Sequence, residues 1–323
     1  MPQLTYAQAV RAALVEEMER DPAVILLGED VALYGGAFRV TEGLVNRFGP
    51  QRVINTPISE NSFVGMAVGA ALTGMRPVVE VMFMDFITLA MDQLVNHAAK
   101  LHYIYGGQAP VPLVVRAPAG AGRGYGASHS QSLEAWFLHT PGLKVVAPAN
   151  PRDARGLLKA AIRDDNPVLC VENKLLYGTK GDVPESDEMV PIGKAAVARE
   201  GDDVSLIAYS RMTALALEAA TELDQAGIHC EVLDLRSLAP LDEEAVLATV
   251  AKTSRAVIVE EDTRRGGVGA EVAALIADRG FDALDSPLRR VACEDVPVPC
   301  SPVLEQAVLP SVEKIVAAVE SLI

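Results

Sequence analysis

The recurrence of short, continuous apolar runs is the feature that most constrains the fold of this chain. The runs include "AVILLGEDV", "RPVVEVMFM", "PLVVRAP" and "PVLCVEN" in the first half, and "DVSLIAYS" and "RAVIVEED" in the second. Segments with the periodicity of amphipathic helices lie between them. Strands that are apolar on both faces and alternate with helices are typical of parallel sheets covered on both sides. The sequence therefore predicts an α/β protein.

Helix start signals support this alternation. In the segment 5–20, apolar residues recur at helical spacing, and Thr5 with Gln8 predicts a capping box. Asn150 before Pro151 predicts an N-cap and a proline at the first helical position. We also expect helices at about 61–73 and 88–101.

A polar segment divides the chain into two predicted domains. The stretch "GTKGDVPESDEMVP" is rich in glycine, proline and acid, which is typical of a linker. A length of 323 residues allows about two domains. We expect a first domain at 1–177, a linker at 178–192 and a second domain at 193–323, each a parallel-sheet sandwich.

Charge and composition limit the partners and the location. The net charge of −15 argues against nucleic acid and anionic membranes as partners. The first residues lack the apolar core of a signal peptide, and no run approaches the roughly 18 apolar residues of a membrane helix. The four cysteines show no CxxC spacing, which favours reduced, mostly buried thiols. We therefore expect a cytoplasmic protein that binds neither nucleic acid nor membrane.

Common catalytic motifs are missing from the sequence. It contains no GxxxxGK[ST] loop, no GxGxxG after a strand, no HExxH, no GxSxG and no Cys/His set with metal spacing. The usual signatures of P-loop ATPases, Rossmann dinucleotide domains, zinc proteases and α/β-hydrolases are therefore absent.

Two polar segments next to apolar runs have both a structural and a functional interpretation. The loop "GAGRGYG" at 120–126 is most simply a flexible loop, although glycines also allow close approach to a ligand. His129 follows it, as an acid/base candidate near neutral pH. Alternatively, Ser128 and Gln131 form the capping box of a helix.

Glu60 begins a segment of small and apolar residues, "ENSFVGMAVGAAL". Ser59 and Glu60 are typical of an N-cap and a first-turn acid. Placing a carboxylate among apolar residues costs free energy unless the carboxylate has a partner. Glu60 is therefore also a candidate functional acid. Phe86 follows a predicted strand, where it either packs in the core or forms a wall for a flat ring.

Several longer stretches together resemble a known family. They are "TPISE", "GAALTGMRPVVEVMFMDF", "DQLVNHAAK", "HSQ", "PGLKVVAP", "GLLKAAIRDDNPV" and "ENKLLYG". In order and spacing they resemble β subunits of the decarboxylating component of 2-oxo acid dehydrogenase complexes, over nearly the whole chain. The pyruvate dehydrogenase type fits best, and acetoin dehydrogenase is near it. Branched-chain 2-oxo acid dehydrogenase β subunits usually read "FADYIFP" where this chain has "FMDFITL".

The resemblance implies a transketolase-like pyrimidine-binding domain followed by a transketolase C-terminal domain. It implies oxidative decarboxylation of a 2-oxo acid, pyruvate by this match, with acyl transfer to a lipoyl group. The cofactor is thiamine diphosphate, shared with an α subunit that holds the diphosphate and Mg²⁺ through a GDG motif. This chain has no GDG, which agrees with a β subunit that is active only with its α subunit. The implied partners are that subunit, in an α₂β₂ heterotetramer, and a dihydrolipoyl acyltransferase core with its lipoyl and peripheral subunit-binding domains.

The resemblance also implies roles for particular residues. Glu60 would contact the aminopyrimidine ring of the cofactor, and Phe86 would pack on that ring, with Ile58 and Met82 lining it. His129 would face the substrate and donate a proton during reductive acylation of the lipoyl group.

A structural potassium site is implied as well, formed largely by backbone carbonyls. The matching positions are Leu113, Ala161, Ile162, Asp164 and Asn166. The alternative is an ordinary helix end before Pro167.

Two other functions remain open from the sequence. The C-terminal half of a split transketolase would have the same fold, but such halves usually lack "IRDDNP" followed by "LYG". A non-catalytic scaffold predicts that loss of the Glu60 carboxylate leaves activity intact. Arg123 and Tyr125, in the loop that varies among family members, are candidates for tuning substrate choice.

Overall fold

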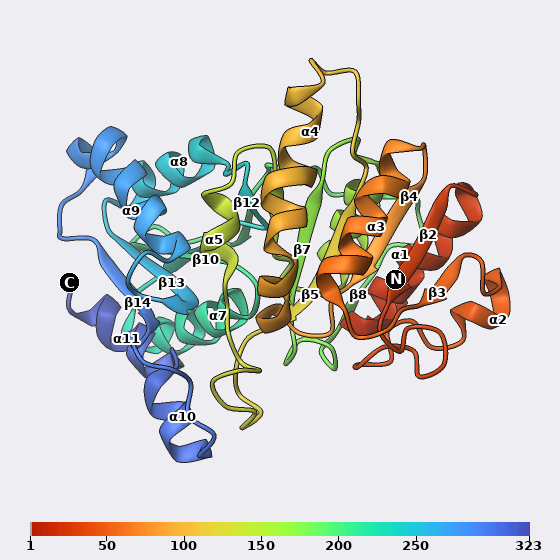
Figure 1. Ribbon diagram of the computed structural model, residues 1–323. Helices are drawn as coiled ribbons and strands as arrows, with labels where there is room; N and C mark the ends of the chain where they lie inside the picture. The colour runs from red at the N-terminus through yellow and green to blue at the C-terminus, as the bar shows by residue number, and fades with distance from the viewer. Residues whose placement is uncertain (1) are drawn as a thin grey trace. The chain divides into compact units, whose positions relative to one another are not determined.

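The structure is a computed structural model that describes residues 2–323 (Figure 1). The chain forms two compact units. Unit 1 comprises residues up to 119 together with 136–192, and unit 2 comprises 120–135 together with 193–323. The predicted domain limits at 177 and 193 stay a prediction, but the grouping of 120–135 with the second unit had no signal in the sequence.

Unit 1 is built on a parallel sheet with the strand order β6-β7-β5-β4-β2-β3. The strands are short and mostly buried because both faces of the sheet are covered. The strands are β2 (Val24–Gly28), β3 (Val53–Asn55), β4 (Arg76–Glu80), β5 (Val114–Ala119), β6 (Lys144–Val146) and β7 (Val168–Asn173). Their parallel register gathers their carboxyl ends at one edge of the sheet.

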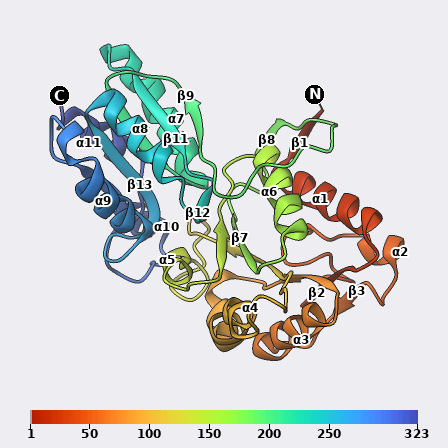
Figure 2. The same ribbon diagram turned by 90° about the horizontal axis from the view of Figure 1, so that it is seen from above.

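Helices cover both faces of this sheet. Figure 2 shows α1 (Tyr6–Arg20) and α6 (Pro151–Arg163) on one face, and α3 (Glu60–Leu72) and α4 (Ala99–Ile104) on the other. A further short helix, α2, spans Leu44–Phe48. Between β4 and α4 the chain forms a 3₁₀ helix at Met84–Ala90 and a π-helix at Asp92–Ala98, so the helix predicted at 88–101 is only partly α-helical.

The two predicted helix starts are confirmed. The Thr5 hydroxyl accepts from Gln8 N at 3.2 Å, and the Gln8 side chain accepts from Thr5 N at 2.8 Å. Asn150 Oδ1 accepts from Asp153 N at 2.9 Å, with Pro151 at the first position of α6. Both caps satisfy backbone N–H groups that have no partner inside the helix.

The polar segment predicted as a linker packs onto unit 1 in its first part. Its strand β8 (Lys180–Asp182) pairs antiparallel with β1 (Gln3–Thr5). Arg155 of α6 then donates at 3.0 Å to the carbonyls of Pro184 and Ser186. The segment therefore forms hydrogen bonds with α6 at least as far as Asp187.

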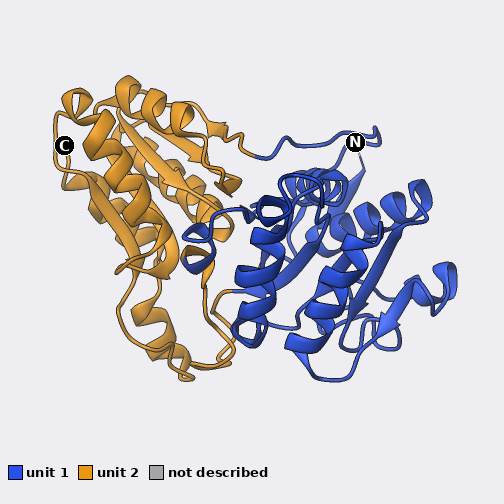
Figure 3. Ribbon diagram, turned by 45° about the horizontal axis from the view of Figure 1, so that its top comes forward, with its two compact units in different colours: residues 1–119, 136–192 blue, residues 120–135, 193–323 orange. Residues whose placement is uncertain are grey.

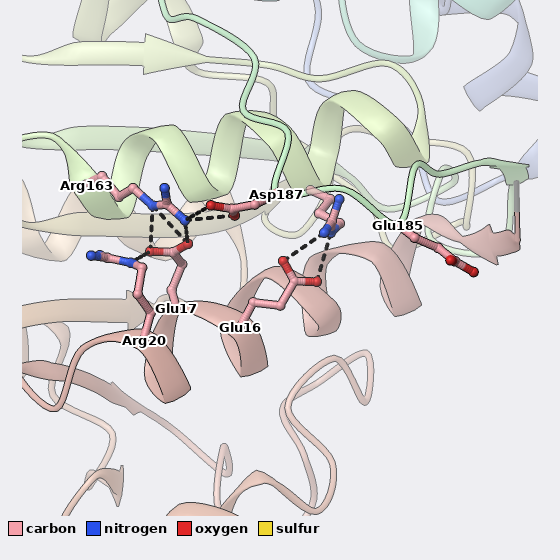
Figure 4. Close-up of a pocket in the computed structure, with 7 residues that line it drawn as sticks. Glu16, Glu17, Arg20, Arg163, Glu185 and Asp187 are labelled. Atoms are coloured by element: carbon pink, nitrogen blue, oxygen red, sulfur yellow. Dashed lines mark hydrogen bonds and ion pairs between the residues drawn. The ribbon is translucent and has the colours of Figure 1, made fainter.

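A pocket of about 380 Å³ lies beside this segment, and Figure 4 shows its lining. Arg155 forms a bidentate pair with Glu16 at 2.9 Å. Arg163 contacts both Glu17 and Asp187. These ion pairs connect α1, α6 and the polar segment, and we call this group of residues the ionic clasp.

Unit 2 contains a five-stranded sheet with the order β14-β13-β10-β11-β9. Only β9 runs antiparallel to its neighbour. Its strands are β9 (Ala196–Arg199), β10 (Val204–Ala208), β11 (Cys230–Asp234), β13 (Ala256–Thr263) and β14 (Arg289–Cys293). Its helices are α7 (Arg211–Leu223), α8 (Glu243–Thr253), α9 (Val268–Arg279), α10 (Pro302–Val308) and α11 (Val312–Glu320), with short elements η3 (Asp224–Ala226), β12 (Ser237–Ala239) and η4 (Phe281–Ala283). Helix α7 packs against α11, and α8 against α9.

Figure 3 shows in orange that the segment 120–135 groups with 193–323 as unit 2, and the last two of its residues begin α5 (Glu134–Leu138).

The cysteines are free thiols: Cys170, Cys230 and Cys293 are buried and Cys300 is exposed, as the sequence suggested. None of the helices within residues 2–323 has the length and apolar character needed to cross a membrane.

Candidate functional site

Two carboxyl groups are buried at the carboxyl edge of the unit 1 sheet. Glu29 directly follows β2, and Glu60 is the first residue of α3, which follows β3. Because Gly28 is in register with Asn55, the ends of β2 and β3 are adjacent. Glu29 is 5% and Glu60 4% exposed. The sequence pointed to Glu60 but not to Glu29, although an acid directly after a buried strand was a usable signal.

The two acids interact electrostatically. Burial, together with the negative charges of Glu60 and Asp30, raises the pKa of Glu29 to about 7. Glu29 Oε1 is buried and has no hydrogen-bond partner within the described residues 2–323. Glu60 lies in the first turn of α3, where the helix dipole favours a negative charge. The arrangement therefore suits a Glu29 that takes up a proton near neutral pH, next to Glu60 at the positive end of a helix dipole.

The N-cap of α3 differs in detail from the expected one. Ser59 occupies the N-cap position, but its hydroxyl points to the Pro57 carbonyl, 3.5 Å away. The backbone position of Glu60 as a first-turn acid is as expected.

Aromatic and apolar side chains lie beyond β4, near the same edge. Met82 and Phe86 are half-buried, and the rings of Phe83 and Phe86 meet edge to face with centroids 5.9 Å apart. Phe83 also meets Phe38 at 5.8 Å. Ile58, in contrast, is 83% exposed. A buried acid pair beside half-exposed aromatic rings fits a flat ligand that carries a basic ring nitrogen.

A buried ion network, which the sequence analysis missed, supports this edge. Arg116 of β5 donates to Glu172 of β7 at 2.7 and 2.8 Å and to Glu80 of β4 at 2.6 Å. The Tyr177 hydroxyl donates to Glu172 at 2.8 Å. Burial raises the pKa of Glu80, and Arg116 opposes that rise. An arginine inside the apolar run "PLVVRAP" was the signal for such a network, because a buried charge requires partners.

The five positions predicted for potassium lie around the C-terminal end of α6 and the residues before β5 and β7. Arg76 Nη1 donates to the carbonyls of Ile162 and Asp164 at 2.9 and 3.0 Å. The Ala161 carbonyl accepts from Asp164 N at 3.2 Å, and the Leu113 carbonyl accepts from Val168 N at 2.8 Å. The Asp164 carboxylate pairs with Lys144 and accepts from Asn166 N at 2.9 Å. A guanidinium thus already brings positive charge to two of these carbonyls, and the potassium site stays a prediction.

No group of three or more His, Cys, Asp or Glu side chains within residues 2–323 is placed to hold a metal ion.

His129 belongs to unit 2, whereas Glu60, Ile58, Met82 and Phe86 belong to unit 1. His129 is half-buried, and its Nδ1 lies 3.0 Å from Ser128 Oγ. The capping box predicted from Ser128 and Gln131 does not form, because the chain is still a loop there and α5 begins only at Glu134. The pattern predicted a helix start too early in the chain, because backbone N–H groups of the preceding loop bond to carboxylates elsewhere in unit 2.

Glu29→Gln is expected to remove one pH-dependent contribution to stability. Folded Glu29 has a pKa of about 7, against about 4.3 for a glutamate in an unfolded chain. Between these values the folded state holds a proton that the unfolded state has lost. The free energy of unfolding of the wild type therefore falls as pH rises, by up to about 1.4 kcal/mol per pH unit.

The variant lacks this titration, so its stability relative to wild type should rise between about pH 5 and pH 7 and then level off. Urea unfolding of both purified chains across this range measures the difference. Other groups, such as Asp262 with its raised pKa of about 7, titrate in both proteins and cancel. The exposed Glu42→Gln serves as the control, and a constant difference between Glu29→Gln and wild type at all pH values would contradict the assignment.

Comparison with known proteins identifies two family domains, and the first of them includes the segment 120–135 that the structure groups with unit 2. Residues 2–180 match the family "Transketolase, pyrimidine binding domain", and residues 193–315 match "Transketolase, C-terminal domain". The pyruvate dehydrogenase E1 component subunit beta of Rickettsia felis is 49% identical, over 98% of each chain. The acetoin:2,6-dichlorophenolindophenol oxidoreductase subunit beta of Bacillus subtilis is 47% identical, over 97% of this chain and 95% of that protein. A solved structure titled as a split gene transketolase, an inactive β4 tetramer, has a TM-score of 0.83 at 27% identity and covers 99% of this chain and 98% of its own.

These matches confirm the predicted fold class and the predicted family. Identity near one half over the whole length favours the E1 β subunits over the split transketolase. The pyrimidine-binding domain implies an enzyme that depends on thiamine diphosphate, and a β subunit implies an α subunit as its partner. The chain belongs to the family of β subunits of the pyruvate dehydrogenase E1 component, an oxidoreductase.

Proposed function

We propose that this chain works with an α subunit to decarboxylate pyruvate oxidatively and to transfer the acetyl group to a lipoyl group. The observation that carries the proposal is the buried Glu60, at the start of α3 beside Glu29, in a domain that matches the pyrimidine-binding family. The proposed assembly is an α₂β₂ heterotetramer in the cytoplasm, docked on a dihydrolipoyl acyltransferase core. Mg²⁺ would be held mainly by the α subunit.

Thiamine diphosphate, when bound, supplies the electron sink that decarboxylation of a 2-oxo acid requires. The role of Glu60 is to hold a proton at a nitrogen of the aminopyrimidine ring, because an ionised carboxylate pairs strongly with a protonated ring nitrogen. Glu29, which takes up a proton near pH 7, reduces the negative charge beside Glu60. Phe86, Met82 and Ile58 would flank the ring and exclude water from it.

The exposure of Ile58 supports a partner on that side of the site. An isoleucine that is 83% exposed gains little from burial within this chain. Contact with the ring or with the α subunit would bury it and contribute about 1.5–3 kcal/mol. The site would therefore be complete only in the assembled enzyme.

His129→Ala is expected to slow acylation of the lipoyl domain more than decarboxylation. Protonation of a lipoyl sulfur during ring opening needs a donor that titrates near neutral pH, and loss of such a group costs about 10²- to 10⁴-fold in rate. The lipoyl reaction is measured with the isolated lipoyl domain, and decarboxylation with an artificial electron acceptor. Ser128→Ala, which removes only the hydroxyl beside Nδ1, is the control. Equal loss in both reactions would contradict this division of labour.

A substrate screen tests the function itself. Co-expression with the cognate α chain should yield an assembly whose kcat/KM is highest for pyruvate among pyruvate, branched-chain 2-oxo acids and acetoin. Acetoin is the second candidate, because the Bacillus subtilis relative is 47% identical. A preference for acetoin would replace the proposed substrate, and turnover of none of these would reject the function.

The potassium site remains part of the proposal. Carbonyl oxygens at a helix end carry partial negative charge and suit a hard cation, and each carbonyl has a second lone pair beyond the one used by Arg76. A melting temperature that rises with KCl but not with NaCl would support it, and identical effects of the two salts would count against it.

A further inference from the structure

The glycine-rich loop 120–126 has a backbone suited to binding an anion. Gly120, Gly122, Gly124 and Gly126 have φ values of 92°, 96°, 68° and 75°, and the residues between them do not have positive φ. Such an alternation of positive and negative φ allows several N–H groups of one loop to bind an anion, an arrangement known as a nest. Glycine is required at the left-handed positions because a Cβ would strain the backbone there.

The anion in this nest is a side chain of the same unit. Glu305, in α10, is 3% exposed. Its Oε1 accepts from Gly122 N at 2.8 Å, and its Oε2 accepts from Gly124 N at 3.0 Å. The carboxylate therefore binds the loop through both oxygens, as a phosphate would bind a loop of the same kind.

Two other acids hold the ends of the same segment. Glu261 Oε1 accepts from Ala121 N at 2.6 Å. The Asp262 carboxylate accepts from the Ala135 N–H. Both acids lie at the end of β13, so carboxylates from two separate elements hold the segment 121–135 on unit 2.

Close packing adds to these hydrogen bonds. A Cβ built at Gly126 would lie 2.3 Å from Cys300 Sγ, and one at Gly124 would lie 3.2 Å from the Cys300 carbonyl. No side chain fits at position 126 without displacing Cys300. The loop thus packs against α10 and against Cys300, two residues before that helix, in contrast to the flexible loop that its composition suggested.

We propose that Glu305 is a positioning residue for His129: its carboxylate holds the glycine-rich loop in the conformation that presents His129, with Arg123 and Tyr125, to the incoming lipoyl group. This inference rests on the proposed role of His129. It assigns no chemical step to Glu305, whose carboxylate is buried and already occupied by two backbone N–H groups.

The substitution that tests the proposal keeps the size of the side chain. In Glu305→Gln the side chain loses one acceptor oxygen and places an NH₂ group against a backbone N–H, so one buried donor loses its partner. Glu305→Asp keeps the charge, but it is shorter by one methylene and reaches only one of the two amides well. The loop should therefore be most stable with Glu at position 305, less stable with Asp and least stable with Gln. Glu320→Gln makes the same change of charge at an exposed site in α11 and is the matched control.

The experiment uses the assembled αβ enzyme and two readouts. Hydrogen–deuterium exchange of the peptide that contains residues 120–126 should be about tenfold faster or more in Glu305→Gln, because a charge-assisted hydrogen bond no longer protects the amides. The kcat for lipoyl-domain acylation should fall about 10- to 100-fold, the cost of misplacing a catalytic group by about 1 Å. Decarboxylation with an artificial acceptor should change much less, Glu305→Asp should be intermediate, and Glu320→Gln should match wild type.

A double variant separates positioning from general damage. If Glu305 acts through His129, adding Glu305→Gln to His129→Ala should slow acylation by no more than about twofold beyond His129→Ala alone. Additive losses would overturn the proposal, as would unchanged exchange or unchanged acylation in Glu305→Gln. Normal acylation in His129→Ala would refute the proposed function of His129. Hydrogen–deuterium exchange in Glu305→Gln would still test whether Glu305 holds the loop. If Glu305→Gln fails to assemble, Glu305→Asp is subjected to the same measurements.

Discussion

Glu60→Gln in the assembled enzyme is expected to abolish oxidative decarboxylation while the heterotetramer persists. The variant keeps the shape of the side chain but cannot hold a proton at a ring nitrogen through a negative charge. Loss of such a group costs about 10²- to 10⁴-fold in rate. Turnover with an artificial electron acceptor isolates this step from lipoyl acylation. Near-normal turnover would refute the proposed role and favour the non-catalytic scaffold.

A second readout of the same variant is independent of turnover. The negative charge of Glu60 is one of the causes of the raised pKa of Glu29. In Glu60→Gln that charge is gone, so the pKa of Glu29 should fall toward its ordinary value, and carboxyl NMR or infrared titration of the purified chain measures it. Glu185→Gln, at an exposed site that Figure 4 shows at the edge of the ionic clasp, is the control and should leave both turnover and this pKa unchanged.

Arg116→Met is expected to destabilise unit 1 by about 3–5 kcal/mol, because it leaves two carboxylates buried without their cation. Glu80 and Glu172 are 4% and 2% exposed, so water cannot replace the guanidinium. A loss of this size is a large part of the total stability of a domain, which is about 5–15 kcal/mol. Urea unfolding of the purified chain measures the loss.

The control is Arg47→Met, which breaks a pair with Glu19 in which both side chains are about half exposed. Exposed pairs contribute about 0–1 kcal/mol, so this variant should be close to wild type. Replacing Glu80 and Glu172 by Gln in the Arg116→Met background should recover part of the stability, because it removes the uncompensated charges. Similar losses in Arg116→Met and Arg47→Met would show that the network contributes no more than a surface pair.

The sequence predicted local structure well where the hydrogen-bond partners lie within the same short segment. The capping box of Thr5 and Gln8 and the Asn150–Pro151 start each involve partners three residues apart, and both formed. The helix expected at 88–101 failed in part: the chain there forms 3₁₀ and π turns before α4. Its apolar spacing indicated a buried helical segment but could not specify which hydrogen-bond pattern the surrounding packing would select.

The failures at the candidate site have a common cause. The pattern of Ser128 and Gln131 matched a capping box, yet the chain there remains a loop, because its partners lie far away in the sequence. Gly122 receives its acceptor from a residue 183 positions later, and Arg116 meets Glu172 across 56 positions. Such pairings carry no periodicity, so sequence reasoning had no means to find them.

The sequence by itself determined the alternation of strands and helices, the family and the candidate acid Glu60, because apolar periodicity, caps and long ordered matches are all written in consecutive residues. The tertiary structure alone decided that Glu29 lies beside Glu60, that Arg116 neutralises two buried acids, and that a glycine-rich loop without a phosphate binds Glu305. Each of these depends on desolvation: a carboxyl group taken out of water either binds a proton, as at Glu29, or requires a partner, and only the folded chain shows which of the two occurs.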